Sequence, residues 1–198
     1  AISGSELRRI DPQSGENILV RDLAALGTLI DIEIRGGRVF AVVRNGIRSE
    51  LVILAANPLE SDTRSQLKDG DYRFLKADQN SPVLLDETRH DLYRIERPLP
   101  FMLAYRLTLV TQDYRDGHWS GNELVYATPF ELRRWREDET ELLLARWGEP
   151  VVDLRRVPTG NQVIFATPTA IIILPSDEQA YRPGLRLASI DAFASFVA

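Results

Sequence analysis

Three apolar runs separated by two chain-reversing dipeptides occupy residues 29–56. The dipeptides are Gly36-Gly37 and Asn45-Gly46, and glycine and asparagine reach the positive φ angles that tight hairpin turns require. The stretch therefore predicts an antiparallel meander of three strands joined by short turns.

Alternation within the first run predicts which face of the meander is buried. Ile30, Ile32 and Ile34 alternate with charged residues. Because successive side chains of a strand point to opposite faces, the three isoleucines would share one face, and we expect that face to be buried. The next two runs, 39–43 and 51–56, are continuously apolar, which is typical of strands covered on both faces.

A helix start is predicted at Thr128-Pro129-Phe130-Glu131. Threonine at the N-cap, proline at the first helical position and glutamate three residues after the threonine together form a capping box. The helix is expected over residues 129–147, with or without a kink near 137–140, because a glycine and a proline follow. A second, short helix is expected over residues 189–198.

The expected fold class is α+β and mainly antiparallel β. It combines the three-stranded meander, a second strand group, one main helix packed across and a short C-terminal helix. No linker or low-complexity block divides the chain, so we expect a single β-rich domain over residues 1–198 with a polar N-terminal arm at 1–17. The matching pieces YATP at 126–129 and FATP at 165–168 are interpreted as coincidence, because a helix is predicted after one and a strand after the other.

The composition excludes several kinds of site. The 198 residues include no cysteine, so disulfides, thiol nucleophiles and cysteine-ligated metals are absent. No segment approaches the ~18 consecutive apolar residues of a membrane helix, so we expect a soluble protein without membrane insertion. The chain begins at Ala1, so an initiator methionine or a leader could have been removed. Since no signal peptide is visible, we expect a cytoplasmic location.

Arginine supplies almost all of the positive charge. Only Lys68 and Lys76 are lysines among 24 basic residues, and 29 acids bring the net charge to −5. Genomic base composition explains this bias, and selection of arginine for bidentate contacts to carboxylate or phosphate is the functional alternative. A pI near 5.2 does not favour a nucleic-acid partner.

Few residues have a pattern that indicates catalysis. The sequence has no phosphate-binding loop, no dinucleotide-binding glycine motif and no nucleophile elbow, and two histidines are too few for a histidine-rich metal cluster. We therefore expect no cofactor, no resident metal and no catalytic residue, which makes an enzyme the less favoured interpretation.

Asp31 and Glu33 are the best candidates for a catalytic pair. Two carboxylates at i and i+2 share a strand face and could hold a divalent cation, with Asp86 as a further ligand. This order resembles the ribonuclease H-like nucleases, which place acids on the first strand of a meander and at the end of a fourth strand. The resemblance implies a metal-dependent nuclease. The alternative is that both acids lie on a solvated face opposite arginines of the next strand.

A second candidate site is the segment 112–122, which is expected to form a polar hairpin tip. Tyr114, Arg115, His118 and Trp119 bring two aromatic rings, a guanidinium and an imidazole into this segment, and such tips often carry binding residues. The alternative is that Trp119 folds back onto its own sheet and leaves the histidine hydrogen-bonded.

The sequence favours a non-catalytic binding or assembly subunit of a larger macromolecular complex. The expected partner is another protein or a second copy of the chain, with Tyr114, Arg115, His118 and Trp119 as the binding residues. The alternatives are the ribonuclease H-like nuclease using Asp31 and Glu33, and a sugar or small-molecule binder using Trp119.

Overall fold

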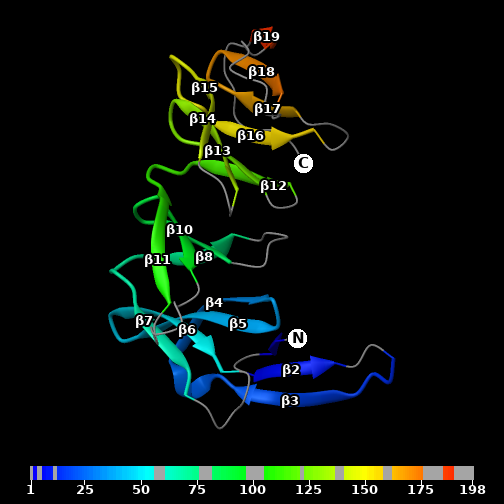
Figure 1. Cartoon of the computed structure of the whole chain (residues 1–198), viewed down its shortest axis with the longest axis vertical. Helices are drawn as coiled ribbons and strands as arrows, with labels where there is room; N and C mark the ends of the chain where they lie inside the picture. The colour runs from blue at the N-terminus through cyan, green and yellow to red at the C-terminus, as the bar shows by residue number, and fades with distance from the viewer. Residues whose placement is uncertain are drawn as a thin grey trace. The chain divides into compact units, whose positions relative to one another are not determined.

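The computed structural model describes residues 2–3, 6–10, 13–55, 61–75, 82–96, 105–120, 123–136, 141–157, 162–175 and 185–189. Within these ranges the chain forms β-strands, turns and one short 3₁₀ turn, η1 (Ala24–Leu26), and it contains no α-helix. The strands follow one another along the chain as coloured in Figure 1.

The strands form five sheets, each built from strands that are consecutive in the sequence. The registers are antiparallel. The first sheet contains β1 (Ile2–Ser3), β2 (Glu6–Ile10) and β3 (Asn17–Asp22). The second contains β4 (Thr28–Arg35), β5 (Arg38–Asn45), β6 (Arg48–Leu54) and β7 (Thr63–Gln66). The third contains β8 (Tyr72–Leu75), β9 (Val83–Asp86), β10 (Asp91–Glu96) and β11 (Arg106–Thr111). The fourth contains β12 (Asp116–Ser120), β13 (Glu123–Ala127), β14 (Glu131–Arg136) and β15 (Leu142–Arg146). The fifth contains β16 (Asp153–Arg156), β17 (Gln162–Ala166), β18 (Ala170–Pro175) and β19 (Leu185–Ser189).

The predicted three-stranded meander is confirmed as β4, β5 and β6. Gly36 and Gly37 both have positive φ, 54° and 72°, as a type I′ turn requires. The second turn lies one residue later than predicted, because Asn45 ends β5 and Gly46 and Ile47 form the turn, with Gly46 at φ 62°. The sheet also has a fourth strand, β7, beside β6.

Four-stranded meanders that follow one another along the chain are the blades of β-propeller architectures. In such a series each sheet is a local unit that buries its faces against its neighbours. The first strands of successive sheets adjoin, β4 with β8 and β12 with β16. The described sheets are therefore of the propeller-blade type, and the α+β fold class is wrong.

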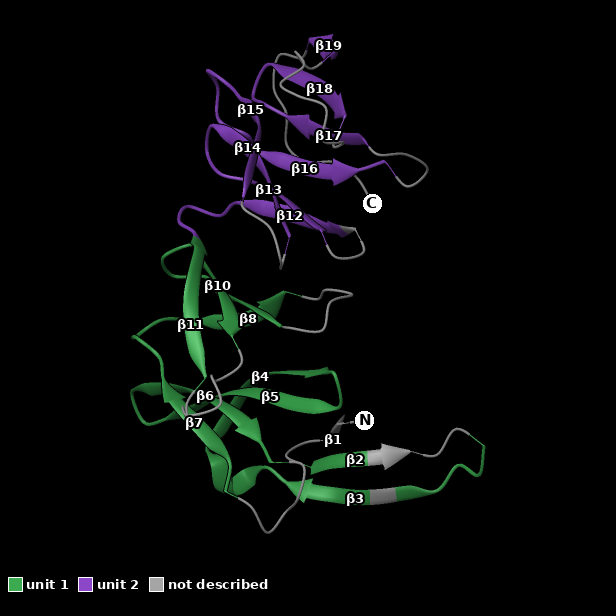
Figure 2. Cartoon of the chain, viewed as in Figure 1, with its two compact units in different colours: residues 1–76, 80–110 green, residues 77–79, 111–198 purple. Residues whose placement is uncertain are grey.

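The chain divides into two compact units (Figure 2). Unit 1 contains residues 1–76 and 80–110, and unit 2 contains residues 77–79 and 111–198. Residues expected to form a polar N-terminal arm contribute β1 and β2 to unit 1. Each unit has its own buried apolar clusters and is described by itself below.

Unit 1 has two apolar clusters, one on each side of the sheet β4–β7. Phe40 and Val42 of β5 pack with the sheet β8–β11, whereas Ala41 and Val43 pack with the first sheet and the η1 segment. Alternate side chains of one strand thus enter different clusters. This confirms that the continuously apolar strands are covered on both faces.

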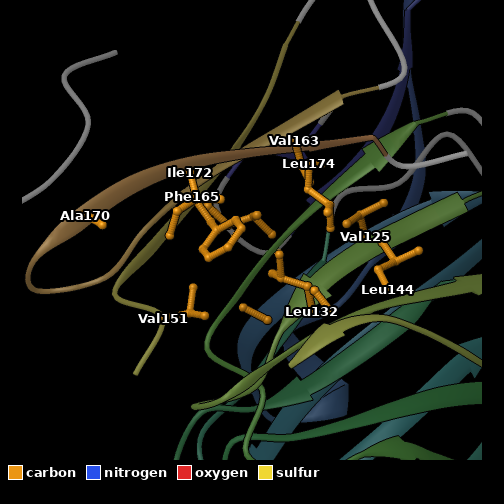
Figure 3. Close-up of a cluster of buried hydrophobic side chains, with 12 residues drawn as sticks. Val125, Leu132, Leu144, Val151, Val163, Phe165, Ala170, Ile172 and Leu174 are labelled. Carbon is orange, nitrogen blue, oxygen red and sulfur yellow. The ribbon is translucent and has the colours of Figure 1, made fainter. Parts of the chain in front are cut away.

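Unit 2 has one apolar cluster between its two sheets (Figure 3). Val125 and Leu132 enter it from the fourth sheet, and Phe165 and Ile172 enter it from the fifth. The ring of Trp147 packs edge-on against that of Phe165, with centroids 4.8 Å apart. A buried aromatic pair of this geometry contributes packing energy beyond its area.

The predicted burial of the isoleucine face of β4 is wrong. Ile30 and Ile34 are exposed and Ile32 is partly buried. A bulge between Leu29 and Asp31 shifts the register, and it is the acidic face that meets the next sheet, where the Asp31 carboxylate accepts a hydrogen bond from β8.

The predicted main helix at 129–147 is also wrong, because its described residues form β14 and β15. The N–H of Thr128 donates to the carbonyl of Glu131 at 2.9 Å, which closes a turn with Pro129 and Phe130 at its centre. Proline suits the second position of a β-turn as well as the first position of a helix. The Glu131 carboxylate pairs with Arg146 and a second arginine instead of capping a helix.

The short C-terminal helix is not found either. Ser189, its predicted first residue, is the last residue of β19, and residues 190–198 lie outside the described ranges.

The interpretation of YATP and FATP as coincidence is wrong. Both tetrapeptides end the second strand of a sheet and begin the turn to the third strand. Their alanine carbonyls, in Ala127 and Ala166, each accept a 2.9 Å hydrogen bond from the residue before the first strand, Arg115 in one sheet and Val152 in the other. The two sequences are therefore equivalent positions of a structural repeat.

Candidate functional site

Side chains of one sheet cap the free backbone edge of the next sheet in each unit. In unit 1, Asp31 Oδ2 accepts a hydrogen bond from the N–H of Phe74 at 2.7 Å. In unit 2, Asp116 Oδ2 accepts from the N–H of Leu154 at 3.2 Å, and His118 Nε2 lies 2.8 Å from the carbonyl oxygen of the same residue. Since a carbonyl only accepts, His118 carries its proton on Nε2. The Leu154 N–H also donates to Asp153 Oδ1 at 2.8 Å, and its carbonyl also accepts from Arg155 Nη1 at 3.3 Å. Side chains therefore satisfy these edge strands in place of a neighbouring strand.

The acids proposed for a nuclease site are engaged with protein donors instead. Besides the Phe74 contact, Asp31 Oδ1 accepts from the N–H of Ile32, and Glu33 forms an ion pair with Arg35 at 2.5 Å. Among the described residues no group of three or more histidine or acidic side chains is placed to hold a metal ion.

Asp86, the third acid of that set, is fully buried at the end of β9. Its Oδ1 accepts from the N–H groups of Thr88 and Arg89, and its Oδ2 accepts from Arg89 Nη1 at 2.7 Å. The hydrogen bond from Arg89 to the Asp86 carboxylate raises the pKa of the Arg89 guanidinium. Burial raises the pKa of the Tyr72 hydroxyl, and the nearby Asp86 carboxylate raises it further. Asp86 therefore organises the turn between β9 and β10.

The four predicted binding residues at 112–122 do not form a hairpin tip, because residues 116–120 are strand β12. Tyr114 is buried with its ring 6.2 Å from that of Tyr126, and His118 is bonded to β16 as described. Trp119 packs edge-on against Trp135 of β14, at 5.9 Å. Only Arg115 of these four is exposed. Their role in binding stays a prediction, but they do not present one surface.

In each unit, a more coherent surface lies where the turns between second and third strands meet the connections between sheets. We call it the turn edge. In a four-stranded antiparallel meander these segments fall at the same end of the strands. The turn edge of unit 1 consists of the connections 23–27 and 67–71 and the turns 46–47 and 87–90. That of unit 2 consists of the connections 112–115 and 147–152 and the turns 128–130 and 167–169.

Two open hollows of about 620 Å³ each adjoin the 46–47 turn in unit 1, and Arg44 and Gly46 line both. Leu23, Gly27 and Asn45 are among the residues that line the first, on the side of the 23–27 connection. The residues that line the second are Ile47, Ser49, Asp69, Gly70, Asp71, Thr88 and Arg89, in addition to the shared pair.

Asn45 and Gly27 fix one side of this turn. Asn45 Nδ2 donates to the carbonyl of Leu26 at 3.1 Å and to Glu50 Oε2 at 3.2 Å. Gly27 has φ 120°, and a Cβ added there would lie 2.2 Å from Asn45 Oδ1. Only glycine therefore allows the connection to approach the turn this closely.

Hydrogen bonds to the 67–71 connection fix the other side. Arg44 Nη2 contacts Asp71 Oδ1 at 2.7 Å, and the N–H of Asp71 donates to Thr88 Oγ1 at 3.0 Å. A Cβ at Gly70 would lie 2.8 Å from Asp86 Oδ1, so glycine is required beside the buried carboxylate. The turn is thus held between two connections whose positions are set by polar contacts.

Ile47 stands at the tip of this held turn with 87% of its surface exposed. The equivalent turn of the fourth sheet presents Phe130, which is 51% exposed. The carbonyl of Phe130 accepts from the N–H of Trp147 at 2.8 Å, so its turn is also held by a connection, in which Val152 is exposed too. The turns of the third and fifth sheets carry Arg89-His90 and Pro168-Thr169 at this place.

The sequence signal for this surface was the Asn45-Gly46 dipeptide. It located the turn, but an isoleucine next to glycine gives no indication of exposure. The exposed aromatic at Phe130 was missed because the same residues were interpreted as the first turn of a helix.

Comparison with known proteins supports the propeller-like fold. No protein-family model and no curated protein matches the sequence. Among solved structures, the N-terminal domain of Nup159 matches with a TM-score of 0.54 and 13% identity, over 87% of this chain and 54% of that one. The likeness is one of fold. This chain spans about half the length of the Nup159 domain.

Two further structures are less similar. The WD40 domain of Toxoplasma gondii coronin has a TM-score of 0.42 and 10% identity, over 82% of this chain and 45% of that one. A putative 6-phosphogluconolactonase of Bacteroides uniformis has a TM-score of 0.47 and 11% identity, over 94% and 65%. Among the described residues of this chain, no helix is long and apolar enough to cross a membrane.

Proposed function

We propose that the protein is a non-catalytic binding subunit that docks a protein partner on its turn edge. The observation that carries the proposal is the recurrence of an exposed apolar residue at the same turn in both units, Ile47 in one and Phe130 in the other. A single exposed aliphatic side chain is ordinary on a protein surface. Its recurrence at an equivalent position of a structural repeat is what favours a contact surface.

The way the 46–47 turn is held supports the same proposal. Binding residues are commonly carried on loops positioned by a rigid scaffold. Here the tip is exposed, whereas its flanks are fixed by Asn45 on one side and by Arg44 with Asp71 on the other. A partner would meet a preformed surface and would pay little ordering entropy on binding.

The size of the native particle tests this proposal. The tagged full-length chain, produced in its native host, is compared with Ile47→Glu and with the matched control Ile34→Glu by sedimentation of the cell extract. Ile34 is 49% exposed at the opposite end of the same sheet, in β4. We expect a particle larger than the lone chain for the wild type and the control, and its loss in Ile47→Glu.

Three outcomes would contradict the proposal: a wild type that sediments as a lone chain, an unchanged particle in Ile47→Glu, or equal loss in both variants. A photoreactive amino acid at position 47, with position 37 in the opposite turn as control, separates the possible partners. A cross-link to another protein supports a heterologous complex, and a cross-link to the same chain supports a homo-oligomer.

A further inference from the structure

Negative charge around the second hollow of unit 1 is largely neutralised within the protein. Asp86 is fully buried and bonded to Arg89, and Glu50 pairs with Arg64 at 3.1 Å while also accepting from Asn45. These carboxylates are therefore not available to a partner, because breaking such contacts would leave charged groups without their hydrogen bonds.

Positive charge around the same hollow is less fully neutralised. Arg48 follows Ile47 at the start of β6 and Lys68 immediately precedes Asp69, so both flank the hollow although neither lines it. Arg48 and Lys68 are exposed, and neither forms an ion pair with another described residue. Asp69 is the single acid lining the hollow that lacks an ion pair within the described ranges.

A third cation at the hollow, Arg44, is already paired within the protein. Arg44 contacts Asp71, whose side chain is 70% exposed. This contact helps to fix the turn, so neither Arg44 nor Asp71 is counted among the charges available to a partner. Cations available to a partner thus outnumber acids around the exposed Ile47.

We infer that the partner presents an acidic segment with an aliphatic side chain, which covers Ile47 while its carboxylates pair with Arg48 and Lys68. This inference rests on the proposed docking function and specifies the chemistry of the partner. Aliphatic contact supplies the affinity, because it removes apolar surface from water on both sides. The charges set orientation and association rate, as complementary charges do at interfaces.

Unit 2 repeats part of this arrangement independently. Arg115, in the connection beside the turn that carries Phe130, is exposed and forms no ion pair among the described residues. Asp113, two residues earlier, is also exposed and has the opposite charge. The charge argument therefore depends on unit 1, whereas the pairing of an exposed apolar residue with a nearby arginine is common to both units.

A labelled peptide tests the inference on the full-length chain. The probe is a fluorescein-labelled nonapeptide with two leucines among four glutamates, flanked by serine and glycine, and binding is measured by fluorescence anisotropy at low salt. Two control peptides replace all glutamates by lysine or both leucines by serine. We expect the acidic, leucine-containing peptide to bind at least about threefold more tightly than either control, and added salt to weaken its binding.

Variants of the chain locate the binding. Ile47→Ser should weaken binding by at least about threefold, because it removes the apolar contact. The double variant Arg48→Glu with Lys68→Glu should also weaken binding by at least about threefold, because exposed charges contribute modestly to binding. The matched controls are Ile34→Ser and Arg106→Glu. Arg106 is an exposed arginine of unit 1 at the start of β11, the end of this strand that lies away from the turn edge. Both controls should bind as the wild type does, and equal thermal melting curves show that each variant is folded.

The outcomes separate this inference from the proposed function. If the lysine peptide bound equally well, or if the charge-reversed variant bound the acidic peptide as the wild type does, the inference that the partner is acidic would be overturned. If Ile47→Ser still weakened binding in that case, the docking surface would stand. If no peptide bound, the inference would be overturned, and the size of the native particle would still decide the proposed function.

Discussion

Close backbone approach at Gly27 makes this residue the most constrained glycine of unit 1. Its φ of 120° is unfavourable for any side chain, and its added Cβ would meet Asn45 Oδ1 at 2.2 Å and the carbonyl of Arg44 at 2.9 Å. Gly27→Ala should therefore lower the free energy of unfolding by about 1–3 kcal/mol. Gly148→Ala, where no atom lies within 4 Å, is the control for urea denaturation. Equal effects of the two substitutions would contradict the close contact.

Trp119 is expected to act in folding through its contact with Trp135. Trp119→Ala should cost up to about 3 kcal/mol, somewhat less than a fully buried tryptophan, because the ring is only partly covered. Its buried Nε1–H has no hydrogen-bond partner among the described residues, so the substitution breaks no hydrogen bond and the loss of stability is smaller still. Arg115→Ala, at an exposed site, should change stability by less than about 0.5 kcal/mol. A stable Trp119→Ala chain would return this side chain to the list of binding candidates.

At the scale of neighbouring strands, the contact between β12 and β16 should depend on pH. Burial raises the pKa of Asp116, and the nearby Asp153 raises it further. The N–H groups of Gly117 and Leu154, together with His118, lower this pKa, but by less than burial raises it. Arg155 also faces the carboxylate, at 3.8 Å. A carboxyl whose pKa is raised in the folded state favours folding when protonated, so its contribution is complete below the ordinary pKa and is lost as pH rises through the folded value.

The measurement compares Asp116→Asn with the wild type by denaturation at about pH 3 and about pH 7. We expect the wild type to be more stable relative to the variant at the lower pH than at the higher one. The opposite trend would mean that ion pairing with Arg155 outweighs burial.

The contact between β4 and β8 gives a test of the nuclease hypothesis. Both Asp31 oxygens accept backbone N–H groups, and Glu33 pairs with Arg35, so a cation would have to displace these donors. Adding Mg²⁺ or Mn²⁺ should therefore leave the melting temperature unchanged, in the wild type and in the Asp31→Asn, Glu33→Gln double variant alike. A metal-dependent rise that the double variant abolishes would reinstate the nuclease.

At the scale of the whole molecule, stability is expected to come from the clusters between sheets. Phe165 is fully buried at the centre of the cluster in unit 2, against Trp147. Phe165→Ala should cost about 3–5 kcal/mol in unit 2. Ile34→Ala, at a half-exposed site in unit 1, should cost about 1 kcal/mol or less. Similar losses in the two variants would contradict the assignment of the core.

Local sequence by itself determined the three strands of the meander and its first turn, and it located the second turn to within one residue. The conformational freedom of Gly36, Gly37 and Gly46 is a property of glycine, and the continuously apolar strands between them could only be covered on both faces. The absence of disulfides follows from the absence of cysteine.

Only the tertiary structure decided between helix and hairpin at residues 128–131. Threonine, proline and glutamate at this spacing suit both, because proline fits the first turn of a helix and the second position of a β-turn alike. Pairing of β14 with β13 and β15, and the burial of Leu132 in the cluster of unit 2, favour the strand. Long-range pairing outweighed the local signal, as it often does for short segments.

The tertiary structure also decided which residues are accessible. Ile47 is 87% exposed and Ile53 of β6 is 5% exposed although both are isoleucines, because exposure depends on which sheet covers each position. Tyr114, His118 and Trp119 looked like surface residues because their neighbours are polar, but each is engaged by a neighbouring strand or sheet. Exposure is a property of how the sheets pack together, and a linear pattern of polar and apolar residues does not contain it.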